Sequence, residues 1–429
     1  YFALVTNTTG ANNTALGVNA LDSNTTADNN TGVGKSALAA CTTGTRNTAV
    51  GAQALDANTT ANQNTAIGYQ SLSSNTTGAG NTALGDESLF SNTTAGNNVG
   101  VGNDALYFNT TGSENTAVGT QALEKNTTAS NNTGVGYLAL KENTTGHSNV
   151  AIGANALDAN TTGQLNVAMG KNSMTANTTG STNTGVGTNT LEQNTTGGAN
   201  TALGDGALNA NTTASNNTAI GRVALSLNTT GHTNTAVGDN CLAGVTTGTE
   251  NVGLGKCATG ITTGSNNIML GHDAGRSNAP SGSITTGSNN VCLGNNSIGN
   301  LFCADTSISS SDSRDKTDVS SFNIGLAWIN ALRPVTYRWD RRTWYGTDAE
   351  PYGTPDGSKK RARLHIGFLA QEALAVEQAN GYGSSNDDSL LVNLTDDGMS
   401  YGMKYERLVP ILVNAIKELS TKVTALEAG

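Results

Sequence analysis

The chain has 429 residues and a formal net charge of −10, with 4% aromatic and 13% charged residues. An acidic chain without a basic stripe cannot neutralise phosphates, and no apolar stretch is long enough to cross a bilayer. We therefore expect neither a nucleic-acid partner nor insertion into a membrane. No signal peptide is visible, and because the chain begins at Tyr1 instead of methionine we expect a fragment or a processed product.

A seventeen-residue repeat dominates the first two thirds of the chain. It reads Asn-Thr-Thr-Gly-x-x-Asn-Thr-Ala-Val/Ile/Leu-Gly-x-x-Ala-Leu-x-x and recurs without insertion or deletion from Asn7 to Val245. Later copies begin at Ile261 and Ile284, so the spacing becomes irregular there. Self-similarity at a short fixed period is typical of solenoids, whose end units deviate from the pattern. We predict a mainly β protein whose units form a β-solenoid, or β-roll, up to about residue 300.

Each unit contains one short stretch with the alternation of a β-strand. In the first unit Thr14 is followed by the small Ala15 and the aliphatic Leu16, and later units keep this order. Gly17 follows at once, which indicates a positive φ or a close backbone approach, and Leu21 comes four residues later. Fifteen such coils at strand spacing would stack to roughly 70 Å.

A single coil of this composition has little to bury. We interpret the strand aliphatic and the leucine as its large apolar groups. The free energy gained by burying these two side chains is small compared with the entropic cost of ordering the backbone. We expect self-association to compensate, because the small residue within the strand would let three chains approach closely around an axis. The repeat resembles the β-roll heads of trimeric autotransporter adhesins, whose unit is shorter, and more closely the Asn-Thr-Ala-Ile-Gly repeats of phage tail fibres. We therefore predict a homotrimeric shaft.

The Asn-Thr-Thr triplets allow two interpretations. They fit the N-glycosylation rule, yet they recur at one turn of the coils, where stacked Asn and Thr side chains would hydrogen-bond from coil to coil. We interpret them as such ladders, and glycosylation stays open for a eukaryotic host.

The cysteines and histidines indicate no site of their own. The four histidines are dispersed and no C-x-x-C spacing occurs, so we expect no metal site, no cofactor and no disulfide framework. Cys241 and Cys257 fall on adjacent coils, but we interpret them as small buried thiols. The cysteines are Cys41, Cys241, Cys257, Cys292 and Cys303.

The composition changes near residue 305, and all three tryptophans follow that point. We predict a shaft over residues 1–304 and a small α+β domain over 305–429. The densest basic cluster of the second domain, Lys359 to Arg363, is interpreted as a solvated loop, with contact to an acidic face of a neighbouring subunit as the alternative.

Four stretches of the second domain match the motifs of a known domain family in the same order. It resembles the C-terminal intramolecular chaperone auto-processing domain of endosialidases and other phage tail spikes and fibres. The matching stretches are Ser309 to Lys316 (Ser-Ser-Ser-Asp-Ser-Arg-Asp-Lys), Ala327 to Trp339, His365 to Glu372, and Met403 to Pro410.

The resemblance implies a domain that trimerises, guides folding of the fibre before it and then cuts itself off between Ser310 and Ser311. By the Ser-Asp-x-Arg-x-Lys motif, Ser311 is the expected nucleophile and Lys316 its base, with Asp312 and Arg314 in supporting roles. A desolvated lysine with a lowered pKa can take the proton of a weakly nucleophilic serine. A polar linker is the alternative interpretation of this stretch, and some relatives keep the domain attached, so retention stays open beside cleavage.

The last segment, about residues 410–428, has the apolar spacing of a coiled-coil helix. Pro410 suits its first turn. The predicted trimer seam consists of Val409, Leu412, Ile416, Leu419, Val423 and Leu426. The alternative is a lone amphipathic helix packed on its own domain.

Together these observations predict a structural, homotrimeric viral tail fibre, from a phage by resemblance, located in the virion after assembly in the host cytoplasm. Expected partners are tail attachment proteins and a host surface glycan or protein receptor. Beyond one turnover of self-cleavage we expect no enzymatic activity. A glycan-degrading tail spike is the main rival, but the acidic residues of the coils occupy variable outward positions and form no evident carboxylate pair. A bacterial trimeric surface adhesin and a fibre of a large eukaryotic virus are further alternatives.

Overall fold

The computed structural model describes residues 2–279, 281–298, 319–346, 350, 352–394 and 401–428. The chain divides into two compact units. The first comprises Tyr1–His272 and Thr285–Leu293, and the second comprises Asp273–Ile284 and Gly294–Gly429. The predicted domain boundary at residue 304 lies outside the described residues and stays a prediction.

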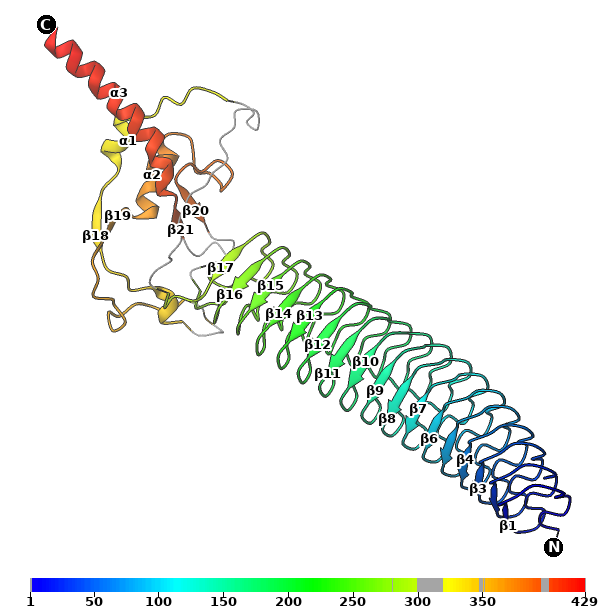
Figure 1. The fold of residues 1–429 in the computed structure, drawn as a ribbon. Helices are drawn as coiled ribbons and strands as arrows, with labels where there is room; N and C mark the ends of the chain where they lie inside the picture. The colour runs from blue at the N-terminus through cyan, green and yellow to red at the C-terminus, as the bar shows by residue number, and fades with distance from the viewer. Residues whose placement is uncertain are drawn as a thin grey trace. The chain divides into compact units, whose positions relative to one another are not determined.

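The first unit is a β-solenoid with one three-residue strand in each coil, as the repeat predicts (Figure 1). The strands are β1 Thr14–Leu16, β2 Thr31–Val33, β3 Thr48–Val50, β4 Thr65–Ile67, β5 Thr82–Leu84, β6 Val99–Val101, β7 Thr116–Val118, β8 Thr133–Val135, β9 Val150–Ile152, β10 Val167–Met169, β11 Thr184–Val186, β12 Thr201–Leu203, β13 Thr218–Ile220, β14 Thr235–Val237, β15 Val252–Leu254, β16 Ile268–Leu270 and β17 Val291–Leu293.

Each strand pairs in parallel with the next one along the chain, so that β1 to β17 form one sheet. From β1 to β15 the paired residues are one repeat apart, as in Thr14 with Thr31. The last two pairings follow the irregular spacing, with Val252 beside Ile268 and Ile268 beside Val291. The sequence period therefore equals one coil of the solenoid.

The interior of each coil is narrow and partly polar. Repeat positions are numbered from the first residue of Asn-Thr-Thr, so that Thr14 stands at position 8. In the coil that begins at Asn126, the fully buried side chains include Asn126, Asn132, Ala139 and Leu140, at positions 1, 7, 14 and 15. Leucine at position 15 is the largest of them, and the other inward positions hold small residues or asparagine.

The strand points its small residue inward, which corrects the sequence interpretation. Ala151 at position 9 is fully buried inside its own coil, whereas Ile152 at position 10 is 37% exposed. A Cβ added at Gly134, also at position 9, would lie 3.3 Å from Cγ of Leu123, so the leucine of the preceding coil fills the space opposite the strand. The small residue is therefore explained by the narrow interior and not by close approach of other chains.

The outward residues at position 10 form a continuous apolar stripe, which we call the aliphatic column. None of its members is buried. It consists of Leu16, Val33, Val50, Ile67, Leu84, Val101, Val118, Val135, Ile152, Met169, Val186, Leu203, Ile220, Val237, Leu254, Leu270 and Leu293.

Asparagine and threonine side chains connect the coils, as the ladder interpretation predicted. The Asn126 amide donates to Oδ1 of Asn109 in the preceding coil at 2.8 Å. The Thr127 hydroxyl donates to the carbonyl oxygen of Thr144 in the next coil at 3.2 Å. Asparagine at position 1 is fully buried in twelve triplets from Asn24 to Asn228, so the folded shaft offers none of these amides for modification.

Four repeat positions take positive φ in the turns: 6, 11, 13 and 15. Two of them are informative. Glycine at position 11 takes positive φ as predicted, with φ of 135° at Gly119, and a Cβ there would lie 2.4 Å from the carbonyl oxygen of Gly136. Leucine at position 15 also does so, with φ of 54° at Leu140, which the sequence did not indicate. A left-handed conformation is unfavourable for an L-residue by roughly 1–2 kcal/mol. Complete burial of the leucine side chain offsets this cost.

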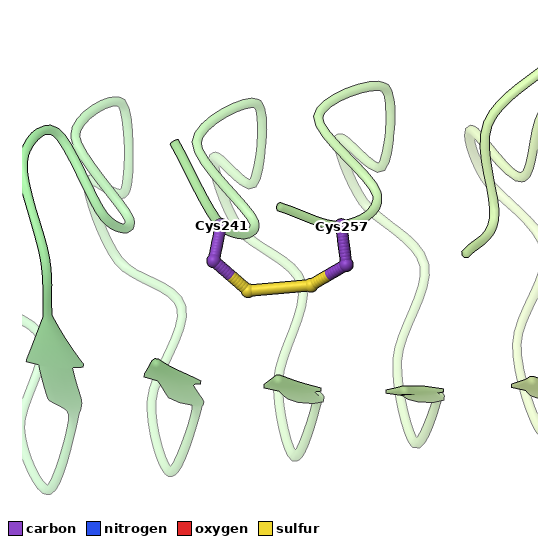
Figure 2. The surroundings of a disulfide bond; sticks show 2 residues. All are labelled: Cys241 and Cys257. Atoms are coloured by element: carbon purple, nitrogen blue, oxygen red, sulfur yellow. A yellow bond between two sulfur atoms is a disulfide. The ribbon is translucent and has the colours of Figure 1, made fainter. Parts of the chain in front are cut away.

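Cys241 and Cys257 are joined by a disulfide, so their interpretation as thiols was wrong (Figure 2). Leu225 and Leu242 donate their backbone N–H to the carbonyls of Cys241 and Cys257, which shows that both cysteines occupy the same slot of successive coils. Their Cα atoms are 4.9 Å apart. Stacking at strand spacing thus brings like positions within the range that a disulfide spans.

The second unit contains the remaining described elements. They are α1 Leu326–Ala331, β18 Val335–Tyr337, η2 Arg342–Trp344, β19 His365–Gly367, α2 Ala370–Ala379, β20 Val392–Leu394, β21 Tyr401–Met403, η3 Tyr405–Arg407 and α3 Leu408–Glu427. Strands β18 and β19 form one antiparallel pair, and β20 and β21 form another. Across the described ranges, no helix has both the length and the apolar character needed to span a membrane.

Candidate functional site

The predicted cleavage motif lies outside the described residues. This applies to Ser310, Ser311, Asp312, Arg314 and Lys316, whose roles stay predictions. The module that follows them is described from Val319 onward.

A small core joins the helices of this module. Trp328 of α1 is 2% exposed. It packs in one cluster with Ala373 of α2, with Ile411 of α3, and with Leu391, which directly precedes β20. The Trp328 indole N–H also donates to the carbonyl oxygen of Val376 at 3.2 Å. Segments as far apart in sequence as Trp328 and Ile411 are thereby held around one side chain.

Glu377 is a buried carboxylate that organises the strand after α2. It accepts hydrogen bonds from the backbone N–H groups of Leu390 at 3.1 Å and Val392 at 3.0 Å, and from the Ser389 hydroxyl at 2.9 Å. Leu391 donates a further backbone N–H. These donors replace the water that the carboxylate loses on burial. Glu377 is therefore a structural anchor between α2 and β20.

Helix α3 is anchored to the chain before α1. The Asn414 amide donates to the carbonyl oxygens of Phe322 at 2.6 Å and Ile324 at 3.2 Å. The Glu418 carboxylate accepts the N–H of Leu326 at 3.2 Å, which satisfies one unpaired donor at the start of α1. The helix begins at Leu408, with Pro410 in its first turn as predicted.

The two sides of α3 differ in burial. Leu408, Ile411 and Ala415 are buried against the module. The predicted seam residues Val409, Leu412, Ile416, Leu419, Val423 and Leu426 are all exposed. Within the described chain the helix thus packs on its own domain with one side and presents an apolar seam on the other. Whether copies of the chain meet there stays a prediction.

The basic cluster in the loop between β18 and β19 is exposed and stacked on aromatic rings. Arg361 lies over the ring of Trp344 at 5.0 Å, and Lys359 over that of Tyr345 at 5.0 Å. Arg341 lies over Trp339 at 4.3 Å, and burial, together with the nearby Arg361, lowers its pKa. The stacked rings were missed in the sequence, although alternation of aromatic and basic residues there is a signal for such pairs.

Fold and geometry define a parallel β-solenoid followed by a small α+β module with an exposed apolar helix face. Residues 311–382 match the family described as chaperone of endosialidase. The match begins at Ser311 and ends just after α2. This match and the solenoid fit a tail fibre that carries a C-terminal chaperone domain, as the sequence resemblance predicted. No curated protein matches the chain.

Proposed function

We propose that the chain is the subunit of a homotrimeric phage tail fibre, with a C-terminal domain that trimerises it, guides its folding and cleaves itself off. The observation that carries this proposal is the chaperone-family match placed after a seventeen-strand solenoid. A chaperone domain of this family implies trimer formation, and a long chain of near-identical coils is the kind of structure that needs such help.

The aliphatic column supplies the contact surface along the shaft. Soluble single chains rarely leave a continuous apolar stripe of this length open to water. A second copy of the chain has the same coil spacing, so its column can meet this one rung by rung. Three columns around a common axis would bury all of them, and the seams of three α3 helices would meet in a coiled coil.

Cleavage would proceed through the serine and the lysine of the Ser-Asp-x-Arg-x-Lys motif. Lys316 takes the proton of the Ser311 hydroxyl, and Oγ attacks the carbonyl carbon of Ser310. The peptide C–N bond breaks as an ester forms, and the Ser311 amine leaves with a proton. Water then hydrolyses the ester. Release after folding would make the trimer kinetically hard to reverse, because the domain that aligned the chains is no longer covalently attached.

The trimer face can be tested with two glutamates. Leu203 in the column is 45% exposed, and Leu227 at position 17 is 55% exposed. We expect Leu203→Glu to weaken the trimer, so that it dissociates to folded monomer at a higher protein concentration than the parent does, because three desolvated carboxylates would meet at one level of the axis. Leu227→Glu should remain trimeric. Light scattering measures the mass and circular dichroism the fold. A monomeric parent, or equal behaviour of both variants, contradicts the proposal.

Self-cleavage is tested separately by intact mass. The parent chain should yield a fragment that begins at Ser311, and Ser311→Ala should stay whole. A parent that stays whole as a trimer would make the domain a retained trimerisation module without peptidase activity. Release of the fragment from both chains would reject Ser311 as the nucleophile.

A further inference from the structure

The aromatic residues of the solenoid are confined to one zone. From Ala3 to Ile298 they occur only at Tyr69, Phe90, Tyr107, Phe108 and Tyr137. Three of them form what we call the aromatic cluster: Phe90, Tyr107 and Phe108. The rings of Phe90 and Tyr107 stack with centroids 5.1 Å apart, and Phe108 packs edge-on to Tyr107 at 4.6 Å. One short zone of an otherwise uniform shaft therefore has a distinct surface.

The cluster lies away from the aliphatic column. Phe90 and Tyr107 stand at position 16 and Phe108 at position 17, directly after the leucine that faces the strand across the coil interior. Phe108 is 44% exposed. The cluster therefore stays open to solvent when the columns of three chains are buried against one another.

Folding of the coils does not require these rings. Other coils place small or polar residues at the same positions, such as Ala39 with Ala40 and Ser73 with Ser74. Those coils keep the same strand and hydrogen-bond pattern. A half-exposed phenylalanine at position 17 therefore has no evident structural task.

The charges around the cluster select among ligands. Tyr107 donates its backbone N–H to the carbonyl oxygen of Asp104 at 3.3 Å, and Phe90 donates to that of Glu87 at 3.2 Å, so each carboxylate belongs to the same turn as one of the rings. Desolvation, and then Glu87 and Asp104, raise the pKa of the Tyr107 hydroxyl. The surroundings of the rings are thus acidic, and a negatively charged ligand would be repelled.

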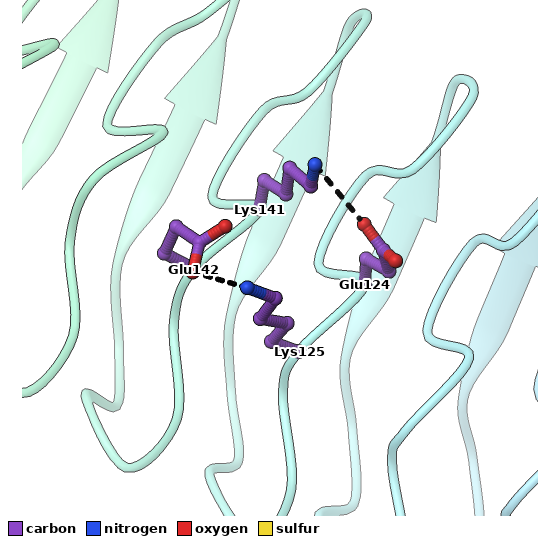
Figure 3. Close-up of polar contacts among 4 residues, drawn as sticks. All are labelled: Glu124, Lys125, Lys141 and Glu142. Carbon is purple, nitrogen blue, oxygen red and sulfur yellow. Dashed lines mark hydrogen bonds and ion pairs between the residues drawn. The ribbon is translucent and has the colours of Figure 1, made fainter.

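The nearest cations are already paired. Between Asn58 and Glu142 the chain has two cationic residues, Lys125 and Lys141. Lys125 Nζ lies 2.7 Å from Glu142 and Lys141 Nζ lies 3.5 Å from Glu124, so two ion pairs lie side by side between adjacent coils (Figure 3). Each ammonium group therefore already has a carboxylate partner.

We propose that the aromatic cluster, with Asp104 and Glu87 at its edge, is a binding site for a neutral glycan. A pyranose ring would lay its C–H face on the exposed ring of Phe108, and its hydroxyls would donate to the carboxylates. A protein partner would need a far larger surface than three rings on two coils. This inference rests on the proposed fibre function and assigns the fibre its host contact.

The test uses the full chain on an array of immobilised neutral hexose, amino-sugar and sialylated oligosaccharides. The parent should bind neutral glycans, and Phe108→Ser should bind them about tenfold more weakly, because one stacking contact is lost. Asp104→Asn, which keeps the rings, should also bind neutral glycans more weakly. Leu227→Ser is the matched control, since it removes a somewhat more exposed apolar side chain at the same repeat position, and it should bind like the parent.

Light scattering on the same samples separates the two proposals. The inference is overturned if the parent trimer binds no neutral glycan or binds only sialylated ones. It is also overturned if Phe108→Ser binds neutral glycans as tightly as the parent. Each of these outcomes leaves the fibre proposal intact. A monomeric parent contradicts the fibre proposal instead.

Discussion

Asn132 illustrates at the scale of one residue how the coils hold together. Its amide donates to the carbonyl oxygen of Gly146, and its Oδ1 accepts the N–H of Asn149, both at 2.9 Å in the next coil. An aliphatic side chain would leave the N–H of Asn149 buried and unpaired, at a cost of about 1–3 kcal/mol. The Gly146 carbonyl would keep one donor, since it also accepts the amide of Asn143 at 2.9 Å. Hydrogen bonds of this kind are directional, so the asparagine columns fix the stacking of the coils as well as contributing to their stability.

Asp158 is a residue whose charge opposes folding. Burial is the main cause that raises the pKa of this position-16 carboxyl. Because its folded pKa lies above the unfolded value, ionisation destabilises the folded state at every pH above the unfolded pKa of about 3.9. We expect Asp158→Asn to raise the melting temperature at pH 7. The gain should shrink as pH falls and vanish once the carboxyl is protonated in both states.

Asp56 is the control for this prediction. It occupies the same repeat position, but the Ser73 hydroxyl donates to its Oδ1 at 2.6 Å. Asp56→Asn should bring no gain at pH 7. If thermal unfolding showed the same pH-dependent gain for both variants, burial of the Asp158 charge would not be its cause.

At the scale of the coil, two glycine positions should respond differently to alanine. Gly119 at position 11 has φ of 135°, and glycine occupies this position after every strand from β1 to β17. Gly112 at position 4 would also bring a Cβ close to backbone, 2.1 Å from the carbonyl oxygen of Ala129, yet alanine stands at this position in other coils, as at Ala95 and Ala129 itself. We expect Gly119→Ala to destabilise the shaft by more than about 1 kcal/mol and Gly112→Ala to be nearly neutral. Denaturant unfolding would measure both, and equal losses would show that the contact outweighs the backbone conformation.

The sequence could predict the strand, the turn glycine and the polar ladders, because each follows from the period and the chemistry of a single unit. It could not predict which strand face is inside. Alternation places Ala151 and Ile152 on opposite faces, but the choice depends on the width of a coil that leucine fills from the other side. The Cys241–Cys257 disulfide was missed for a related reason, since only the stacked coils bring equivalent positions together.

The candidate sites differ in how much of each could be predicted from the sequence. Ser311 and Lys316 were assigned by resemblance, and they lie outside the described residues, so they stay predictions. The apolar seam of α3 was readable from its spacing, and its exposure is a structural finding. The aromatic cluster was visible in principle, because aromatic residues are absent from most coils. The residues of the cluster stand at positions 16 and 17, which vary from unit to unit and are not part of the repeat pattern.

At the scale of the whole molecule, the repeat that builds the shaft also creates ambiguity between chains. A slip of one chain against its neighbours by one coil, about 4.8 Å, aligns nearly the same residues and loses only the contacts of an end coil. The aliphatic column is chemically uniform and cannot prevent this. A non-repetitive domain after the shaft can, because the seam from Val409 to Leu426 aligns in one way.

This predicts how the shaft behaves without its tail. A chain shortened to residues 1–304 should assemble into a mixture of species with staggered ends, whereas the full chain carrying Ser311→Ala should give one species, since its tail stays in place throughout folding. Sedimentation velocity resolves the two cases, because staggered rods are longer and sediment more slowly at equal mass. Adding the separate tail domain to the shortened chain should not narrow the distribution, because alignment needs the covalent link between seam and shaft. A shortened chain as uniform as the full one would mean that the variable coil positions, such as those of Lys125 and Lys141, already set the register.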